Sequence, residues 1–173
     1  MNEEDFPEKG QRALASQSVP MPRGDASLVR QGYSQSEIEA LYALARTFLA
    51  SGETGPSERM SKGIVSVAPE FAPAWLMLAY IYLMQENRNE TIFSARQALR
   101  AQPNSVEALL FLVIAYFQAE DFQTGGTFLG EVAELVHGER GTPELRRLYD
   151  SQVIRFEERL KQGSKQARRK ELP

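Results

Sequence analysis

The sequence predicts an all-α superhelix of three stacked helix pairs closed by a C-terminal capping helix. Pro69 and Pro103 lie one 34-residue step apart, and apolar residues recur at helical spacing in three consecutive frames of that length. A further amphipathic stretch begins at Thr142, after the third frame. A single helix pair cannot bury its own apolar face, and about three stacked pairs are the usual minimum for a stable array.

The central frame carries the fullest repeat signature, which is that of the tetratricopeptide (TPR) repeat. It reads Trp75-x-x-Leu78-Ala79-x-x-Tyr82, then Ala95, Ala98-Leu99 and Pro103. The preceding frame has Leu41, Leu44-Ala45, Phe48, Gly52, Ile64-Val65 and Pro69 at the same offsets. The following frame has Leu109, Leu112-Val113, Tyr116, Phe122, Leu129 and Val132-Ala133, with His137 in place of the proline. The fold class therefore follows from the period.

The first ordered helix is expected to begin near Glu37, because Ser36-x-x-Glu39 has the pattern of a capping box, and to run to Ala50. The other helices of the array are expected at 57–67, 71–85, 88–101, 105–119 and 122–137. Thr142-Pro143-Glu144 supplies an N-cap, a first-turn proline and an acid, so a seventh helix should run to about Gln162 and cover the open end of the last repeat.

Some positions depart from the repeat pattern. Ser57 and Ser61 stand where an alanine and a large apolar residue are usual, so we expect the second helix of the first pair to be weakly packed. Gly125 and Gly126 favour close helix packing over a hinge. Trp75 is assigned to packing between the two helices of its own pair.

The expected organisation is a disordered segment at 1–33, a TPR domain with its capping helix at 34–162, and a disordered basic tail at 163–173. The chain has 173 residues, of which 42% are apolar and 25% charged, so it can bury one core. A net charge of −3 argues against nucleic-acid binding, and no apolar run approaches the roughly 20 residues that span a bilayer. The acidic start is unlike a signal peptide, so we expect the protein to stay in the cytoplasm, where it is made.

Enzymatic chemistry has little support. The chain has one histidine, His137, and no cysteine, which removes thiol nucleophiles and thiolate metal sites. Glu131, Glu134 and His137 share a helix face, but carboxylate-bridged metal sites repeat such a motif on a second helix, and no second copy exists. Nucleotide-binding glycine motifs are absent. We therefore expect no catalytic residue, metal or cofactor.

With catalytic, metal and nucleotide sites unsupported, the candidate binding surface is the inner face of the superhelix. The first helix of each pair lines this face. Helical periodicity places an unusually apolar set of residues on it. We expect these residues to form a peptide-binding groove, unless the N-terminal segment or the last helix fills it: Tyr42, Arg46, Leu49, Leu76, Tyr80, Leu83, Leu110, Ile114 and Phe117.

Residues 34–162 resemble the class II chaperones of bacterial type III secretion, of the SycD/LcrH type. The similarity is carried by Ser34-Gln35-Ser36-Glu37-Ile38-Glu39-Ala40-Leu41-Tyr42-Ala43-Leu44-Ala45 with Phe48 and Ser51-Gly52, and by Gly126-Thr127-Phe128-Leu129 with Ala133-Glu134-Leu135. The loop 52–56 departs from the family pattern because it lacks the aromatic that usually follows the turn glycine, and Thr91 replaces an alanine.

The resemblance implies a non-enzymatic chaperone that holds an apolar, extended segment of a secreted translocator-like client in its groove before export. It also implies a possible homodimer, for which Leu28, Val29 and the first helix could supply the interface. The alternative is a TPR scaffold or co-chaperone subunit of a secretion or envelope assembly. Neither function involves nucleic acid or membrane insertion.

Overall fold

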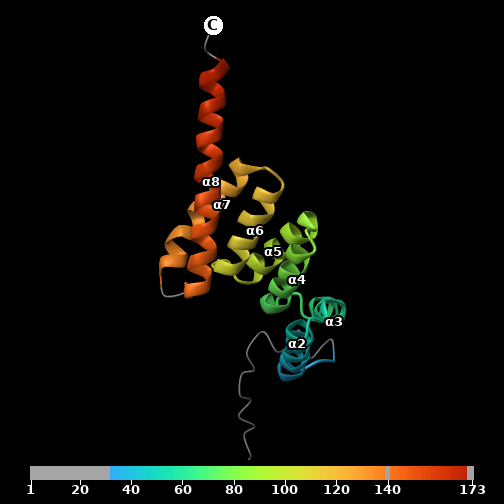
Figure 1. The fold of residues 1–173 in the computed structure, drawn as a ribbon. Coiled ribbons are helices and arrows are strands. Elements are labelled where there is room, and N and C mark those ends of the chain that lie inside the picture. The colour runs from blue at the N-terminus through green and yellow to red at the C-terminus, as the bar shows by residue number, and fades with distance from the viewer. Residues whose placement is uncertain (1–31, 139–140, 171–173) are drawn as a thin grey trace, which may run out of the picture.

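The computed structural model describes residues 32–138 and 141–170, and these form helices without strands (Figure 1). The helices are α2 (Gln35–Ala50), α3 (Thr54–Val67), α4 (Ala72–Met84), α5 (Arg88–Ala101), α6 (Val106–Gln118), α7 (Phe122–His137) and α8 (Pro143–Lys170). The first six bounds lie within three residues of the expected ones, and the all-α TPR architecture is confirmed.

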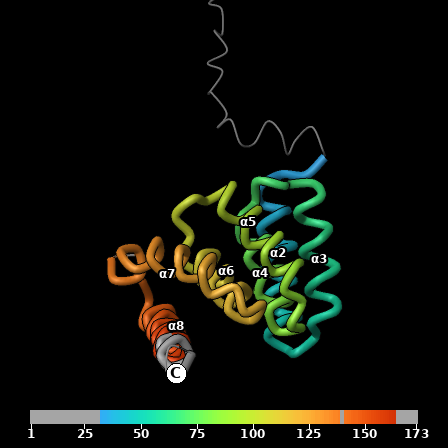
Figure 2. The backbone as a smooth tube through the Cα atoms, turned by 90° about the horizontal axis from the view of Figure 1, so that it is seen from above, coloured from blue at the N-terminus to red at the C-terminus, as the bar shows by residue number. Residues whose placement is uncertain are grey.

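The helices pack in sequence order as three pairs, α2–α3, α4–α5 and α6–α7, and α8 closes the array against α6 and α7 (Figure 2). The turn inside each pair has one residue in the left-handed region: Gly52 (φ 82°), Glu86 (φ 56°) and Glu120 (φ 60°). These residues are 34 positions apart, so the period read from the sequence is also a period of the backbone. Only the first of them is a glycine, the residue that adopts this conformation without steric cost.

The capping box at the start of the array lies two residues earlier than predicted. Ser34 is the N-cap of α2 and accepts from the backbone N–H of Glu37, while the Glu37 carboxylate accepts from the Ser34 N–H at 2.7 Å. This bond lowers the pKa of Glu37. Glu39, the expected partner, instead accepts from the side chain of Gln35. The predicted Thr142 cap of α8 is confirmed.

The first helices of the second and third pairs form the centre of the core. α4 carries no charged residue, and seven of its 13 residues are buried, because α3, α5 and α6 surround it. Trp75 lies edge-on to Phe93 of α5, with ring centroids 5.8 Å apart, and its indole N–H donates to the Pro69 carbonyl at 2.8 Å. Trp75 therefore packs within its own helix pair, as expected.

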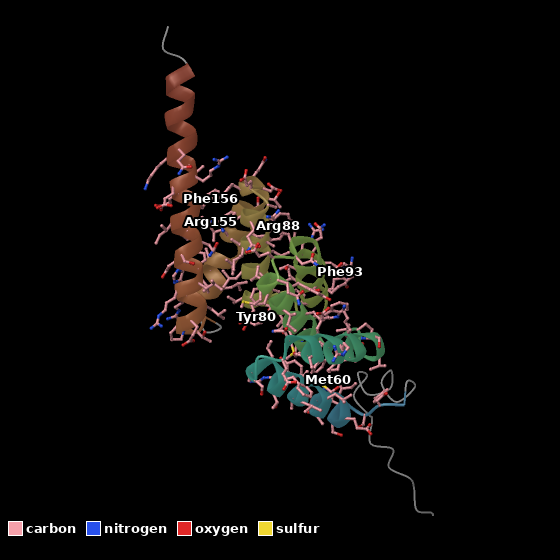
Figure 3. The ribbon with its side chains drawn as sticks, turned by 45° about the vertical axis from the view of Figure 1, so that its right-hand side comes forward. Met60, Tyr80, Arg88, Phe93, Arg155 and Phe156 are labelled. Carbon is pink, nitrogen blue, oxygen red and sulfur yellow. The ribbon has the colours of Figure 1, made fainter. Side chains whose placement is uncertain are left out.

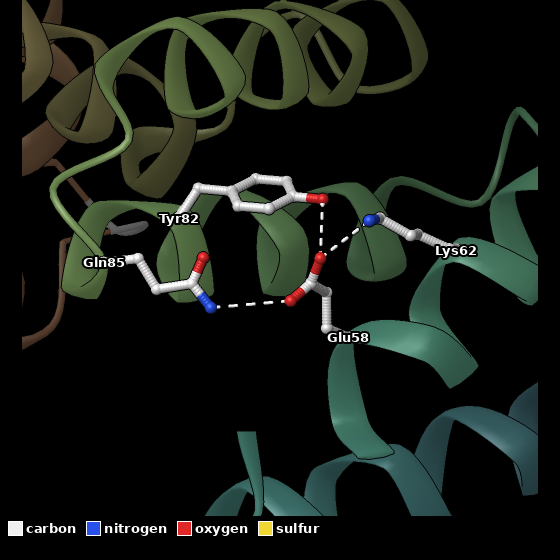
Figure 4. Close-up of polar contacts among 4 residues, drawn as sticks. All are labelled: Glu58, Lys62, Tyr82 and Gln85. Atoms are coloured by element: carbon white, nitrogen blue, oxygen red, sulfur yellow. Dashed lines mark hydrogen bonds and ion pairs between the residues drawn. The ribbon is translucent and has the colours of Figure 1, made fainter. Parts of the chain in front are cut away.

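The two serines of α3 are fully buried and have a common partner. The hydroxyls of Ser57 and Ser61 donate to the thioether sulfur of Met77 on α4 at 3.2 and 3.1 Å. A polar contact thus replaces the apolar packing that is usual at these positions. Beside it, Glu58 of α3 accepts from Tyr82 Oη of α4 (3.2 Å), and this hydrogen bond joins the two helices. Glu58 also forms an ion pair with Lys62 Nζ (2.7 Å) within α3 (Figure 4).

The glycines of α7 allow two aromatic rings to approach. A Cβ at Gly125 would lie 2.5 Å from the ring of Phe117, and one at Gly126 would lie 2.8 Å from the ring of Phe156. Phe117 of α6 and Phe156 of α8 stack in parallel at 5.7 Å, and Arg155 of α8 donates to the Phe117 carbonyl. This close packing accounts for both glycines without a hinge.

The capping helix is longer than predicted. α8 continues from Pro143 to Lys170, so the expectation of a disordered tail is wrong for residues 163–170, which are helical. The stretch 162–170 contains no proline, and its single glycine, Gly163, lowers helix propensity without ending the helix. The predictions made for residues 1–31, including Leu28 and Val29, and for 171–173 lie outside the described residues.

Candidate functional site

An open groove of about 490 Å³ runs along the first helices of the three pairs. α2, α4 and α6 each contribute to its walls, and its lining is mostly apolar. The lining residues are Tyr42, Arg46, Leu49, Ala50, Leu76, Met77, Tyr80, Glu107 and Phe111. Figure 3 shows Tyr80 and Phe93 on opposite sides of the α4–α5 pair, so the groove faces away from the second helices.

Aromatic contacts hold the walls of the groove. Tyr42 packs edge-on against Phe71 at 5.4 Å, and Tyr80 lies 6.3 Å from Phe111, the ring that α6 contributes. Burial raises the pKa of the Tyr42 phenol, and the neighbouring Arg46 guanidinium partly opposes this shift. The phenol therefore stays neutral at physiological pH. Tyr80 remains 40% exposed, so a ligand could cover it.

The groove has one charged group at each end. Arg46 on α2 is exposed, and no ion pair is found for it within the described residues. Glu107 lies in the first turn of α6, where the Ser105 hydroxyl donates to its carboxylate at 3.3 Å. The middle of the groove, formed by Leu76, Met77 and Tyr80 of α4, carries no charge. The surface can thus accept apolar side chains between two charges of opposite sign.

The structure brings together five of the nine predicted residues: Tyr42, Arg46, Leu49, Leu76 and Tyr80. Leu83 and Ile114 are half-buried and do not line the groove. The expectation that Leu110 and Phe117 face a ligand is wrong, because both side chains are 0% exposed.

The capping helix explains these two corrections. Leu110 packs in a cluster that includes Leu145, Leu148 and Tyr149 of α8. Phe117 packs in another with Tyr149, Val153 and Phe156 of the same helix. The last helix therefore fills the inner face of the third pair, and the open groove belongs chiefly to the first two.

The sequence reasoning missed Ala50, Met77 and Phe111 as lining residues and did not select Glu107 among its site residues. Phe111 follows Leu110 directly, so the face that α6 turns to the groove is rotated by about 100° from the regular repeat position. The apolar residues of α8 indicate this rotation, because they need apolar partners on α6. The two serines of α3 point to Met77, because their buried hydroxyls need a hydrogen-bond acceptor.

Other kinds of site find no support in the part of the chain that the structure describes. No group of three or more histidine, aspartate or glutamate side chains is arranged to hold a metal ion there. His137, the helix-end histidine, lies edge-on to Tyr149 at 5.5 Å. Among the described helices, none combines the length and the apolar character needed to cross a bilayer.

No protein-family model and no curated protein matches the chain. Solved structures do. SycD of Yersinia enterocolitica, a type III secretion translocator chaperone, matches with a TM-score of 0.67 at 15% identity over 73% of this chain and 96% of SycD. One SycD structure contains a peptide of the translocator YopD, and another is described as an alternative dimer.

Two further structures extend the comparison. PcrH in complex with the chaperone binding region of PopD matches with a TM-score of 0.63 at 15% identity, over 73% of this chain and 92% of PcrH. The TPR domain of Sgt2 from Aspergillus fumigatus matches with a TM-score of 0.62 at 18% identity, over 72% and 82%. The chain therefore has the all-α TPR fold that its sequence predicts, and it shares this fold with the translocator chaperones of type III secretion.

Proposed function

We propose that this protein is a non-enzymatic chaperone that binds an extended apolar segment of a secreted, translocator-like client in the groove of α2, α4 and α6. The observation that carries the proposal is the open apolar groove with Tyr80 at its centre. Each apolar side chain that a client buries there contributes roughly 1.5–3 kcal/mol before ordering costs. Masking a client in this way is passive and requires no nucleotide.

The similarity to SycD and PcrH supports the proposal, because SycD is found with a peptide of the translocator YopD and PcrH with the chaperone binding region of PopD. On this reading the protein acts in the bacterial cytoplasm, before the client is exported. The described dimer of SycD supports a homodimer as a further part of the proposal. Its interface would include α2, where the exposed Leu44 and, just before the helix, the exposed Tyr33 border a second apolar hollow.

The test begins with purification of the full chain from its native host together with a co-expressed secreted partner. The bound segment of that partner is mapped with overlapping peptides, and its affinity is measured by fluorescence anisotropy. Tyr80→Glu should weaken binding more than a hundredfold, because the client would bury an uncompensated carboxylate. Helical content and melting temperature should stay near those of the wild type, because Tyr80 is 40% exposed.

Phe93→Glu is the matched control. Phe93 is 50% exposed on the opposite side of the α4–α5 pair, so the same change there should leave client binding intact (Figure 3). Unchanged affinity in Tyr80→Glu would rule the groove out as the client site. If Phe93→Glu alone abolishes binding, the outer face is the functional surface, and the scaffold function replaces the chaperone function.

A further inference from the structure

We infer that the groove selects client segments with a charge pattern, an acidic residue that meets Arg46 and a basic residue that meets Glu107, with apolar anchors between them. This inference rests on the proposed function and adds to it the chemistry of the bound segment. Its basis is the placement of a cation on α2 and an anion on α6, at the two ends of a groove whose middle is uncharged.

Both charged groups are available to a ligand. Arg46 and Glu107 are exposed, and the structure shows no ion pair between either of them and another described residue. Glu107 keeps one contact, from the Ser105 hydroxyl, which fixes its position without neutralising it. A neutral apolar segment would therefore leave two opposite charges unmatched at the rim, whereas a segment of the right pattern would match both.

The spacing of the pattern follows from the helices. Packed helices lie about 8–10 Å apart, so the two steps from α2 through α4 to α6 cover roughly 16–20 Å. An extended chain advances about 3.3 Å per residue, and only its alternate side chains face the same way, so an acid and a base that both face the groove should be separated by about six positions. The two side chains between them that share this face would be the anchors over Leu76, Met77 and Tyr80.

The two charges also give the groove a direction. A segment that runs from α2 to α6 meets Arg46 first, and a segment that runs the other way meets Glu107 first. The acid must lie at the α2 end in either case, so the chain direction of the client is tied to the order of its charges. Exposed charge pairs are individually weak, and we expect each match to change affinity roughly twofold to fivefold.

The experiment selects a displayed library of random peptides of about twelve residues on the full-length protein. Wild type should enrich peptides that contain an acid and a base about six positions apart. Arg46→Glu makes both charges of the groove negative and should enrich peptides with two bases at that spacing, whereas Glu107→Arg makes both positive and should enrich peptides with two acids. Arg88→Glu and Glu131→Arg, which make the same charge changes at exposed sites outside the groove, should keep the wild-type pattern. The preference should shrink in about 1 M salt, where such pairs are screened.

The outcomes separate this inference from the function on which it rests. If wild type enriches apolar peptides without the acid–base pair, or if Arg46→Glu and Glu107→Arg both keep the wild-type pattern, the charge pattern is refuted and the apolar groove stands. If Tyr80→Glu enriches the same peptides as wild type, they bind elsewhere, and the groove function itself is refuted.

Discussion

Replacing Met77 with leucine tests whether its sulfur is the hydrogen-bond partner of two buried hydroxyls. A change from methionine to leucine in a core usually costs less than about 1.5 kcal/mol, because the volume is conserved. Here it would also remove the acceptor of Ser57 and Ser61, which are both fully buried. A buried polar group without a partner costs about 1–3 kcal/mol, although a helical serine can turn its hydroxyl to the carbonyl four residues earlier. We expect a total loss of about 2–4 kcal/mol.

The assay is urea unfolding followed by circular dichroism, applied to a double-mutant cycle. In a Ser57→Ala/Ser61→Ala background the hydroxyls are gone, so Met77→Leu should cost less than about 1.5 kcal/mol. Met60→Leu is the control, because Met60 is a half-buried methionine of α3 that packs in the same region, and no hydrogen bond to its sulfur is found in the described residues. If the cost of Met77→Leu is the same in both backgrounds within about 0.5 kcal/mol, the sulfur is not a functional acceptor.

Three further predictions concern stability. Gly125→Ala should lower the free energy of unfolding by about 1–2 kcal/mol, because the added methyl group clashes with the Phe117 ring. Gly130→Ala, where the methyl group enters open space in the same helix, should raise the free energy of unfolding by about 0.5–1 kcal/mol. Urea titration distinguishes the two, and a gain at both sites would contradict the packing described for α7. Glu86→Gly and Glu120→Gly should each add about 0.5–1 kcal/mol, because glycine relieves a left-handed backbone, and an unchanged melting temperature would argue against that conformation in solution. Contact with Lys62 holds the pKa of Glu58 below its ordinary value of 4.5. The ionised carboxylate therefore stabilises the folded state fully above pH 4.5, and this stabilisation is lost as the pH falls through the lower pKa of the folded state. Glu58→Gln should therefore melt below wild type at pH 7, and thermal melts at pH 3–4 should show a smaller difference; a constant gap would refute the ionic contribution.

The fold could be predicted from the sequence because the repeat period fixes both the helix lengths and the partner of each helix. The turn residues 52, 86 and 120 show the same spacing in the backbone. The start of the first helix was misplaced because Ser34 and Ser36 both have a glutamate three residues later, and the pattern alone does not choose between them. The end of α8 differs from the prediction because clustered charge and a glycine are compatible with a helix as well as with disorder, and here the stretch is helical.

The groove was predicted well where helices meet only their neighbours in the repeat. Tyr42, Leu76 and Tyr80 belong to the first two pairs, whose inner faces α8 does not cover in the part of the chain that the structure describes, and they line the groove at the positions that periodicity predicts. Leu110 and Phe117 belong to the third pair, where α8 adds a packing partner that the repeat pattern does not contain. Their burial depends on how a non-repeated helix docks, which the spacing of residues within the repeats does not encode.

The left-handed turns at 34-residue intervals make the length of this protein adjustable in whole units. Residues 72–105 run from the start of α4 to the N-cap of α6, so a second copy inserted after Ser105 would meet the same junctions on both sides. The duplicated chain would keep α8 on the last pair and would lengthen the groove by one helix spacing of about 8–10 Å. That distance corresponds to about three residues of an extended peptide, so each added repeat would extend the peptide length that the proposed groove can hold by about three residues.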